Sequence, residues 1–426
     1  MPTEKEIFAN APLAAGKTYV DAGTGMSIKT LSTNSASAQV QVLNLPGKVE
    51  VKGSELTYSS YPGVRNNVTV SLSGGTFTVA DRGLASLPAG PGCSPTADPQ
   101  AVECDATGIT QETVSLGEED DRFTNSADIR AVVNGGTGHD QLYGGPADDS
   151  LDGEAGIDLL DGRGGADSLD GGPDTDTLNG GSGADSLAGG AGTDTLDGGD
   201  DDDSLMAGLD ADTMHGGAGI DIADSSDHFK PIKADLDSQP GDDGQSRERD
   251  TIATDVEGLR GGESHDRLTG NSGANTIDGD VGDDRIFGAP SAGGPDAGDT
   301  LSGGLGRDKI YGRKGDDTIA GGFEDDKLYG DDGNDTMAGD TGGNSVYGGN
   351  GDDTLTSMVG GIDKLFGNGG NDVFHAKDGD GQDSLTCGVG ANSGEADSGD
   401  ALKDSSACVS VTQAAAPPSL LSALGL

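Results

Sequence analysis

Acidic side chains recur at one position of a nine-residue repeat that begins at Gly135. Ten nonapeptides, GGSGADSLA and GGAGTDTLD among them, follow one another without a break to Asp224. The sixth position is always aspartate and the eighth is apolar. Carboxylates at a fixed spacing are ligands for a hard cation, so the chemistry that this pattern offers is metal binding. The ten predicted ligands are Asp140, Asp149, Asp158, Asp167, Asp176, Asp185, Asp194, Asp203, Asp212 and Asp221.

A second, less regular block of the repeat begins at Gly261 with GGESHDRLT. The spacing slips in three places, yet the apolar residue two positions after the acid survives each slip, as insertions into a loop would allow. Asn275 and Asn344 replace the acid in two units, and Asp383 ends the series. The predicted ligands of this block are Asp266, Asp284, Asp299, Asp308, Asp317, Asp326, Asp335, Asp353, Asp363 and Asp372.

The nonapeptide predicts one short strand and one tight turn. The residues around the eighth position alternate polar and apolar, as in a strand, and the six before them are rich in the glycine that a reversal needs. Two units therefore complete one coil. Stacked coils form two parallel sheets with the leucines between them, at about 4.8 Å per coil. The predicted fold is all-β, a parallel β-roll (a two-sheet, right-handed solenoid) with an N-terminal β cap region.

This stacking brings the sixth-position carboxylates into two rows, one on each edge of the roll. Like charges about 5 Å apart repel by nearly 1 kcal/mol even in water, and a divalent cation between successive turns reverses that sign. Ca²⁺ suits the site because it accepts six to eight oxygens in flexible geometry, whereas Mg²⁺ demands a tighter octahedron. The repeats offer no cluster of Cys or His for a transition metal.

The composition excludes several classes of protein. With 77 Gly, no Trp and 32% hydrophobic residues among 426, the chain lacks the side chains of an ordinary globular core. A formal net charge of −50 opposes binding to nucleic acid or to an anionic membrane, and no apolar stretch is long enough for a membrane span. Low hydrophobicity with high charge is also typical of disorder, but the phase of the repeat contradicts that interpretation.

The run GGAGTDTLD resembles the nonapeptide of the RTX, or haemolysin-type, calcium-binding repeats. The resemblance covers about 135–224 and 261–385. It implies a Ca²⁺-dependent parallel β-roll in which sixth-position aspartates and turn carbonyls of stacked units share the ions. The aspartates of the first block are the best ligands, and Asn275 and Asn344 mark weaker or vacant sites. The resemblance also implies a secreted, extracellular or cell-surface protein.

We expect five segments along the chain: an N-terminal β domain or solenoid cap (1–130), the first roll block (131–224), a spacer that links the blocks (225–260), the second block (261–385), and a C-terminal cap and tail (386–426). The N-terminal segment contains alternating stretches, and NNVTVSLSGGTFTVAD predicts a hairpin that turns at Gly74 and Gly75. TVSLGEEDDRF resembles a worn repeat that leads into the roll.

Four cysteines form two local couples, Cys93 with Cys104 and Cys387 with Cys408. Their even number and loop placement favour two disulfides and an oxidising compartment, and four unpaired thiols are the alternative. No signal-peptide core follows Met1 in the sequence given, so we expect a removed leader or another export signal. The apolar tail PPSLLSALGL is a candidate C-terminal secretion signal or an ordinary frayed end.

Three functions remain open from the sequence. The first is a non-enzymatic extracellular calcium-binding structural or surface protein that folds as Ca²⁺ binds. The second is a secreted hydrolase, of protease or lipase type, with a catalytic part in residues 1–130, although no catalytic motif is found there. The third is an adhesin or ice-binding protein. It requires regular outward threonine rows, for which Thr175, Thr177, Thr193 and Thr195 are too sporadic.

Overall fold

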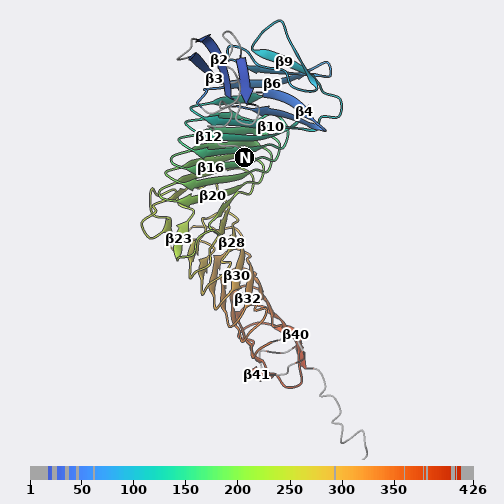
Figure 1. Ribbon diagram of the computed structural model, residues 1–426. Helices are drawn as coiled ribbons and strands as arrows, with labels where there is room; N and C mark the ends of the chain where they lie inside the picture. Colours follow the sequence, from blue (N-terminus) through green and yellow to red (C-terminus); the bar gives the residue numbers. More distant parts are fainter. Residues whose placement is uncertain are drawn as a thin grey trace, which may run out of the picture. The chain divides into compact units, whose positions relative to one another are not determined.

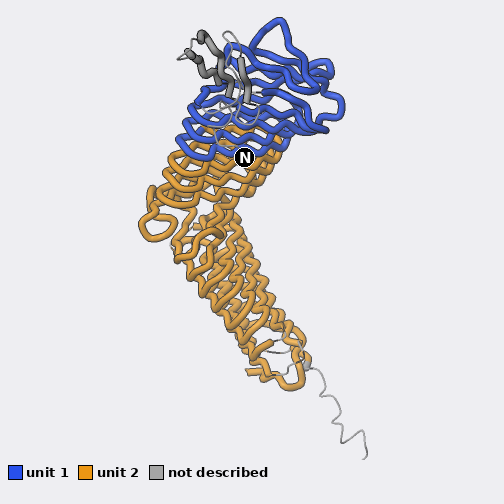
Figure 2. Tube along the Cα trace, viewed as in Figure 1, with its two compact units in different colours: residues 1–158 blue, residues 159–426 orange. Residues whose placement is uncertain are grey.

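The computed structural model describes residues 18–21, 26–33, 38–44, 48–60, 63–291, 294–358, 360–377, 379, 382–403, 408 and 410–413. Strands and turns account for its regular structure, and the described residues include no helix that could cross a membrane. The strands, some of which are labelled in Figure 1, belong to two compact units, residues 1–158 and 159–426 (Figure 2). The all-β solenoid predicted from the sequence is confirmed.

Each nonapeptide of the first block contributes one strand and one turn. In β16, Ser168–Pro173, the side of the strand that carries Leu169 and Gly171 is buried, and the residues before each of them are exposed. Gly172 has a φ of 99°, a left-handed conformation that glycine adopts at little cost, and the chain turns there. The strand that pairs with β16 comes two units later, so one coil contains two nonapeptides.

Unit 1 combines the first coils with antiparallel hairpins. Strands β5, β10, β12 and β14 pair in parallel, and β4 is antiparallel to β5. A second sheet joins β6, β11 and β13 in parallel and adds β7, β9 and β8 by antiparallel pairing. Strands β1, β2 and β3 form a separate antiparallel sheet. The hairpin predicted at Gly74 and Gly75 joins β6 to β7.

The strands of unit 1 are β1 Thr18–Asp21, β2 Met26–Thr33, β3 Ala38–Asn44, β4 Lys48–Lys52, β5 Glu55–Ser59, β6 Asn67–Ser73, β7 Thr76–Asp81, β8 Cys93–Pro95, β9 Ala101–Asp105, β10 Gln111–Glu118, β11 Arg122–Asn125, β12 Arg130–Thr137, β13 Gln141–Tyr143 and β14 Ser150–Ala155.

Unit 2 contains the remaining coils, and three sheets divide its strands. Sheet I runs in parallel through the whole unit and comprises β16, β18, β20, β22, β26, β28, β30, β32, β34, β36, β38, β40 and β42. Sheet II comprises β15, β17, β19, β21 and β25, all parallel. Sheet III comprises β24, β23, β27, β29, β31, β33, β35, β37, β39 and β41, parallel except for β24.

The first strands of unit 2 are β15 Leu159–Gly164, β16 Ser168–Pro173, β17 Thr177–Ser182, β18 Ser186–Ala191, β19 Thr195–Asp200, β20 Ser204–Leu209, β21 Thr213–Ala218, β22 Ile222–Asp224, β23 Ile232–Asp235, β24 Gly244–Gln245, β25 Thr251–Ile252, β26 Gly258–Arg260, β27 Arg267–Thr269 and β28 Thr276–Asp278. The later ones are β29 Arg285–Phe287, β30 Thr300–Leu305, β31 Lys309–Lys314, β32 Thr318–Phe323, β33 Lys327–Asp332, β34 Thr336–Ala338, β35 Ser345–Asn350, β36 Thr354–Thr356, β37 Lys364–Gly369, β38 Val373–Ala376, β39 Ser384–Thr386, β40 Ser393–Ala396, β41 Ala401–Lys403 and β42 Ser410–Gln413.

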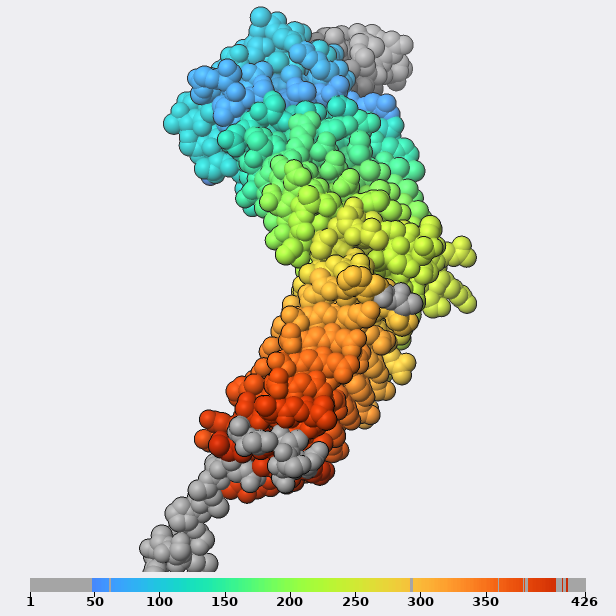
Figure 3. All heavy atoms as spheres, turned by 180° about the vertical axis from the view of Figure 1, so that it is seen from behind, coloured from blue at the N-terminus to red at the C-terminus, as the bar shows by residue number. Residues whose placement is uncertain are grey.

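Residues 225–260 exchange one sheet for another. Sheet I continues through them, because β22 pairs directly with β26. Sheet II ends where β21 pairs with β25, and sheet III starts with β23 and β24. The loops around β23 project from the side of unit 2 (Figures 1 and 3). The spacer therefore adds strands to the stack at the point where sheet III replaces sheet II opposite sheet I.

The core is a column of eighth-position side chains. In the first block the leucines at this position are at most 1% exposed, and Met214 and Ala223 are 5% and 2% exposed. Leu301, Leu365 and Leu385, which follow the three slips in spacing, are equally buried. The insertions therefore leave the strands in register.

Disulfides join both cysteine couples. Cys93 and Cys104 lie opposite each other on β8 and β9, with their Cα atoms 4.1 Å apart. Cys387 and Cys408 are joined with their Cα atoms 5.4 Å apart. The predicted pairing is therefore present, and the alternative of four unpaired thiols is wrong.

Candidate metal centre

All twenty aspartates predicted as ligands are buried. Each is at most 3% exposed. The sixth position directly precedes the strand, so its side chain lies where the turn closes over the end of the core. The residue at the eighth position, two places later, points the same way, as the period of a strand requires.

One carboxylate oxygen of each aspartate ties neighbouring coils together. The backbone N–H of Asp194 donates to Oδ1 of Asp212 at 2.7 Å, and Oδ1 of Asp194 accepts the N–H of Asp176 at 2.8 Å. In the second block, Asp299 donates to Asp317 at 2.8 Å and Asp317 to Asp335 at 2.9 Å. The acids thus form the two rows expected from the stacking. Within a row, each acid accepts the backbone N–H of the acid in the preceding coil.

The second carboxylate oxygen is buried without a hydrogen-bond partner in most of these residues. Among the described residues this holds for Oδ2 of Asp140, Asp185, Asp194, Asp203, Asp212, Asp221, Asp284, Asp299, Asp308, Asp317, Asp326, Asp335, Asp353 and Asp372. A buried carboxylate oxygen without a partner is costly, so its recurrence down two rows indicates a missing positive group.

Glycine at the first position leaves room beside these oxygens in every such unit except that of Asp212, which has Ala207 there. A Cβ at Gly180 would lie 2.3 Å from Oδ2 of Asp185 and 2.6 Å from the carbonyl oxygen of Gly198, one coil on. Gly198 has the same surroundings, with Oδ2 of Asp203 at 2.3 Å. A carboxylate oxygen and a backbone carbonyl oxygen therefore meet at a place that any larger residue would fill.

Burial also raises the pKa of these carboxyl groups. It raises the pKa of Asp212, Asp284, Asp317 and Asp326 to about 8, with a further contribution from neighbouring acids in the same row. It raises the pKa of Asp203, Asp299 and Asp353 to about 7 and of Asp185, Asp194, Asp308, Asp335 and Asp372 to about 6. The ionised form is disfavoured at each place, as expected for metal ligands that lack their cation.

Two of the predicted ligands differ from the rest. Oδ2 of Asp149 accepts the N–H of Gly145 at 2.6 Å, and Oδ2 of Asp266 accepts the N–H of Gly262 at 2.8 Å. Asp149 belongs to the second nonapeptide of the first block, and Asp266 to the first nonapeptide of the second block. Their second oxygens are satisfied by the turn itself, so these two aspartates are weaker candidates than the others.

Three acids that the prediction omitted continue the rows. Asp121, in the worn repeat, is 3% exposed, has an unpaired Oδ2 and accepts the N–H of Asn66 at 2.6 Å. In the spacer, Asp250 accepts the N–H of Asp212 at 3.0 Å, and Glu257 accepts that of Asp221 at 3.1 Å. Each stands two residues before a buried apolar side chain, which is the signal that could have identified it.

A fourth such residue, Glu112, occupies the sixth position of an early coil. The register places it in line with Ala131 on the next strand, and one coil further on this line reaches Asp149. Glu112 is 0% exposed and neither of its carboxylate oxygens has a hydrogen-bond partner. Burial, with the charge of Asp149, raises its pKa well above the ordinary value.

A separate acidic group lies beside β23. Single carboxylate oxygens of Asp235, Asp237 and Asp242 lie within 4.8 Å of one another. The ammonium group of Lys233 already lies 2.5 Å from Asp235 and 3.1 Å from Asp242. A cation of the protein therefore compensates part of the charge of this group, which differs from the two rows in that respect.

The donor set fits calcium. Its members are carboxylate and carbonyl oxygens, they recur at every coil, and their charge is otherwise uncompensated. The RTX calcium-binding nonapeptide repeat matches residues 132–160, 152–187, 188–223, 260–290, 296–328, 329–360 and 359–383. The chain belongs to the RTX repeat family. Repeats of this family bind calcium in general, and these matches cover both blocks of the RTX roll. A comparison with curated proteins finds no match.

Proposed function

We propose that this RTX chain is an extracellular calcium-binding structural or surface protein whose coils fold as Ca²⁺ binds. One observation carries the proposal: a buried, unpaired Oδ2 recurs along both rows of aspartates. Such rows are tolerated in a folded protein only if cations neutralise them.

The two carboxylate oxygens of each sixth-position aspartate have different roles in this proposal. Oδ1 of each sixth-position aspartate holds the backbone of the preceding coil, as between Asp176 and Asp194. Oδ2 and the first-position carbonyls, such as that of Gly198, would hold Ca²⁺. The bound ion supplies positive charge, so the carboxylates stay ionised and the turns are drawn together.

The extracellular location has two supports. Disulfides form and persist in oxidising compartments, and this chain has two. RTX repeat proteins are typically secreted. Outside the cell Ca²⁺ is abundant enough for sites of millimolar affinity, which is the range of extracellular calcium modules.

Circular dichroism of the full chain in chelator, followed by titration with Ca²⁺ and separately with Mg²⁺, tests the proposal. We expect little β structure in chelator and a cooperative gain as Ca²⁺ rises through about 0.1–1 mM, with Mg²⁺ far less effective. An unchanged spectrum on adding Ca²⁺ would contradict the proposal.

A pair of variants tests whether the sixth-position aspartates cause the Ca²⁺-dependent folding. Asp194→Asn removes the charge from a buried sixth-position acid, whereas Asp197→Asn removes an exposed charge on β19, the strand that directly follows Asp194. We expect only the first to shift the Ca²⁺ midpoint, by about two- to tenfold, because one ligand charge is lost from adjacent sites. Equal shifts would mean that overall charge, not ligation, drives folding.

Threonine rows favour a second candidate function, ice binding. Thr276, Thr300, Thr318, Thr336 and Thr354 are in register on sheet I, and Thr177, Thr195, Thr213 and Thr251 on sheet II. The rows are regular at every second unit, which the expectation drawn from the sequence overlooked. Freezing-point depression by the Ca²⁺-loaded chain, lost in Thr318→Lys and kept in Asp170→Lys, would support this candidate; no depression would exclude it.

A further inference from the structure

Five basic side chains form a row on the outer face of sheet III. Arg267, Arg285, Lys309, Lys327 and Lys364 hold the seventh position of their units and are in register, with Ser345 between the last two. Four are exposed and Lys309 is partly exposed. We call these five residues the cationic row. The same register leads from Arg267 to Lys233, which is set apart from the row because it pairs with Asp235 and Asp242.

The cationic row is uncompensated within the part of the chain that the structure describes. None of its five members has an ion pair with a described carboxylate. The acid directly before each member is a sixth-position aspartate, whose side chain is buried on the opposite side of the strand from the row. Of the acids next in sequence, Asp283 pairs with Arg307, and Asp325 accepts the N–H of Gly343. Like charges on adjacent strands are destabilising. Five aligned bases are unusual in a chain whose net charge is −50. The row therefore indicates an anionic partner.

An aromatic row lies beside it, at the ninth position of β29, β31, β33, β35 and β37. Phe287, Tyr311, Tyr329, Tyr347 and Phe366 stack on one another with ring centres 4.6–5.0 Å apart and nearly parallel planes. Because each ring covers its neighbour, the row turns edges and tyrosine hydroxyls outward, and the inner ring faces are closed to a ligand.

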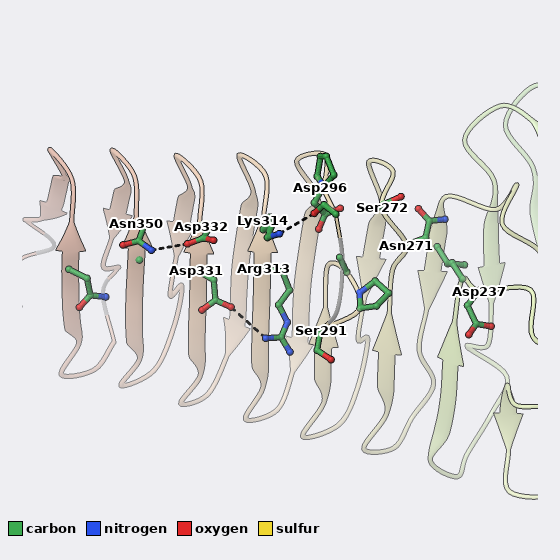
Figure 4. A pocket seen from close by; sticks show the side chains of 17 residues that line it. Asp237, Asn271, Ser272, Ser291, Asp296, Arg313, Lys314, Asp331, Asp332 and Asn350 are labelled. Carbon is green, nitrogen blue, oxygen red and sulfur yellow. Dashed lines mark hydrogen bonds and ion pairs between the residues drawn. The ribbon is translucent and has the colours of Figure 1, made fainter.

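A hollow follows the other side of the aromatic row. Its volume is about 800 Å³, and its lining includes Arg313, Asp331, Asp332, Asn350 and Asn368, whose strands run side by side in Figure 4. Asn350 donates to Asp332 at 2.8 Å, and Arg313 lies 3.8 Å from Asp331. Carboxylates and amides of this kind bind hydroxyl groups.

We propose that this face of sheet III binds a linear acidic polysaccharide of the polyuronate class, lying along the coil axis. Its carboxylates would contact the cationic row, and its hydroxyls the tyrosine hydroxyls and the polar groups of the hollow. The proposal rests on the proposed function, because the row exists only when the coils are stacked.

The same face is unsuited to nucleic acid. Single strands bind proteins largely by stacking their bases on exposed aromatic faces, and here the rings stack on each other. The acids of the hollow would also repel a phosphate on every residue, whereas a sugar ring can turn its uncharged hydroxyl edge toward them. The observations therefore favour a uronate polymer over a phosphate polymer.

Binding of a galacturonate decamer to the full Ca²⁺-loaded chain, measured by calorimetry, tests the inference. We expect binding that weakens as salt rises, no binding of a neutral glucan of equal length, and weaker binding of a single-stranded DNA decamer. The double variant Lys309→Gln/Lys327→Gln should weaken binding about tenfold, and Lys309→Arg/Lys327→Arg should restore it.

The matched control is Lys377→Gln/Arg307→Gln, which removes the same charge from the same block but outside the cationic row. Equal weakening by both charge-removing pairs would overturn the inference, as would stronger binding of DNA or of the neutral glucan. Circular dichroism of each variant in Ca²⁺ separates the two claims: a chain that folds with calcium yet binds no decamer refutes this inference alone.

Discussion

On our proposal, a single aspartate at the sixth position serves both the backbone and the ion. Asp194 shows the division, with one oxygen on the N–H of Asp176 and the other buried beside the turn of its own unit. Asparagine can replace only the first role: Asn344 still accepts the N–H of Asp326 at 2.8 Å, but it brings no charge. The asparagine units therefore keep the ladder of hydrogen bonds, and we expect them to bind the cation less tightly.

Glu112 tests whether this logic extends beyond the nonapeptides. We expect it to bind Ca²⁺ together with Asp149, because both of its oxygens are buried without partners and the charge of Asp149, beyond Ala131 in the same row, acts on it. In Glu112→Gln, Ca²⁺ should no longer increase the protection of β10 and β12 amides against hydrogen exchange, while the coils of unit 2 remain protected.

Glu103→Gln is the control, since it removes an exposed charge from β9 of the same unit. A glutamic acid that is simply protonated in the fold would give the opposite result. Glutamine would then mimic it, and protection would rise with Ca²⁺ as in the parent chain.

At the scale of the strand and turn, the rows make each coil sensitive to pH. Burial raises the pKa of Asp212, Asp284, Asp317 and Asp326 from 3.8 to about 8. The folded coil without calcium then binds more protons than the unfolded chain between pH 4 and 8. The stability that these protons confer is complete below pH 3.8 and is lost as pH rises through about 6 to 8.

We therefore expect the chain in chelator to gain β structure when pH is lowered from 8 to 5.5, because protons take over part of the cation's role. Circular dichroism and urea unfolding at both values provide the measurement. Exposed acids titrate near pH 4, so they contribute little in this window. A flat response would show that the buried acids do not limit folding.

At the scale of the whole chain, the sequence predicted the coil because two chemically different positions stay in phase. The phase of the repeat also predicted the buried leucines. The two disulfides were predicted separately, because the cysteines of each couple lie close together in the sequence. Asp121, Asp250 and Glu257 were missed because they occupy the sixth position without a surrounding nonapeptide, and only strand pairing places them there.

The surface rows were missed for a different reason. Consecutive units belong to opposite sheets, so comparing units at a nine-residue spacing mixes two faces. Lys309 and Thr318 are one unit apart, yet the first belongs to sheet III and the second to sheet I. When units are compared one coil apart, the basic, aromatic and threonine rows become visible. The insertion after Asp284 makes one interval between members longer but does not interrupt the rows.

The ladder of aspartate hydrogen bonds has a direction. Each sixth-position N–H finds its acceptor in the coil that follows it in sequence, from Asp140 with Asp158 to Asp383 with Asp400. A segment that joins the N-terminal side of a finished stack meets a complete template, whereas one that joins the other side must supply the acceptor itself. We therefore expect assembly to start at the C-terminal end, in the coils that the disulfide between Cys387 and Cys408 joins.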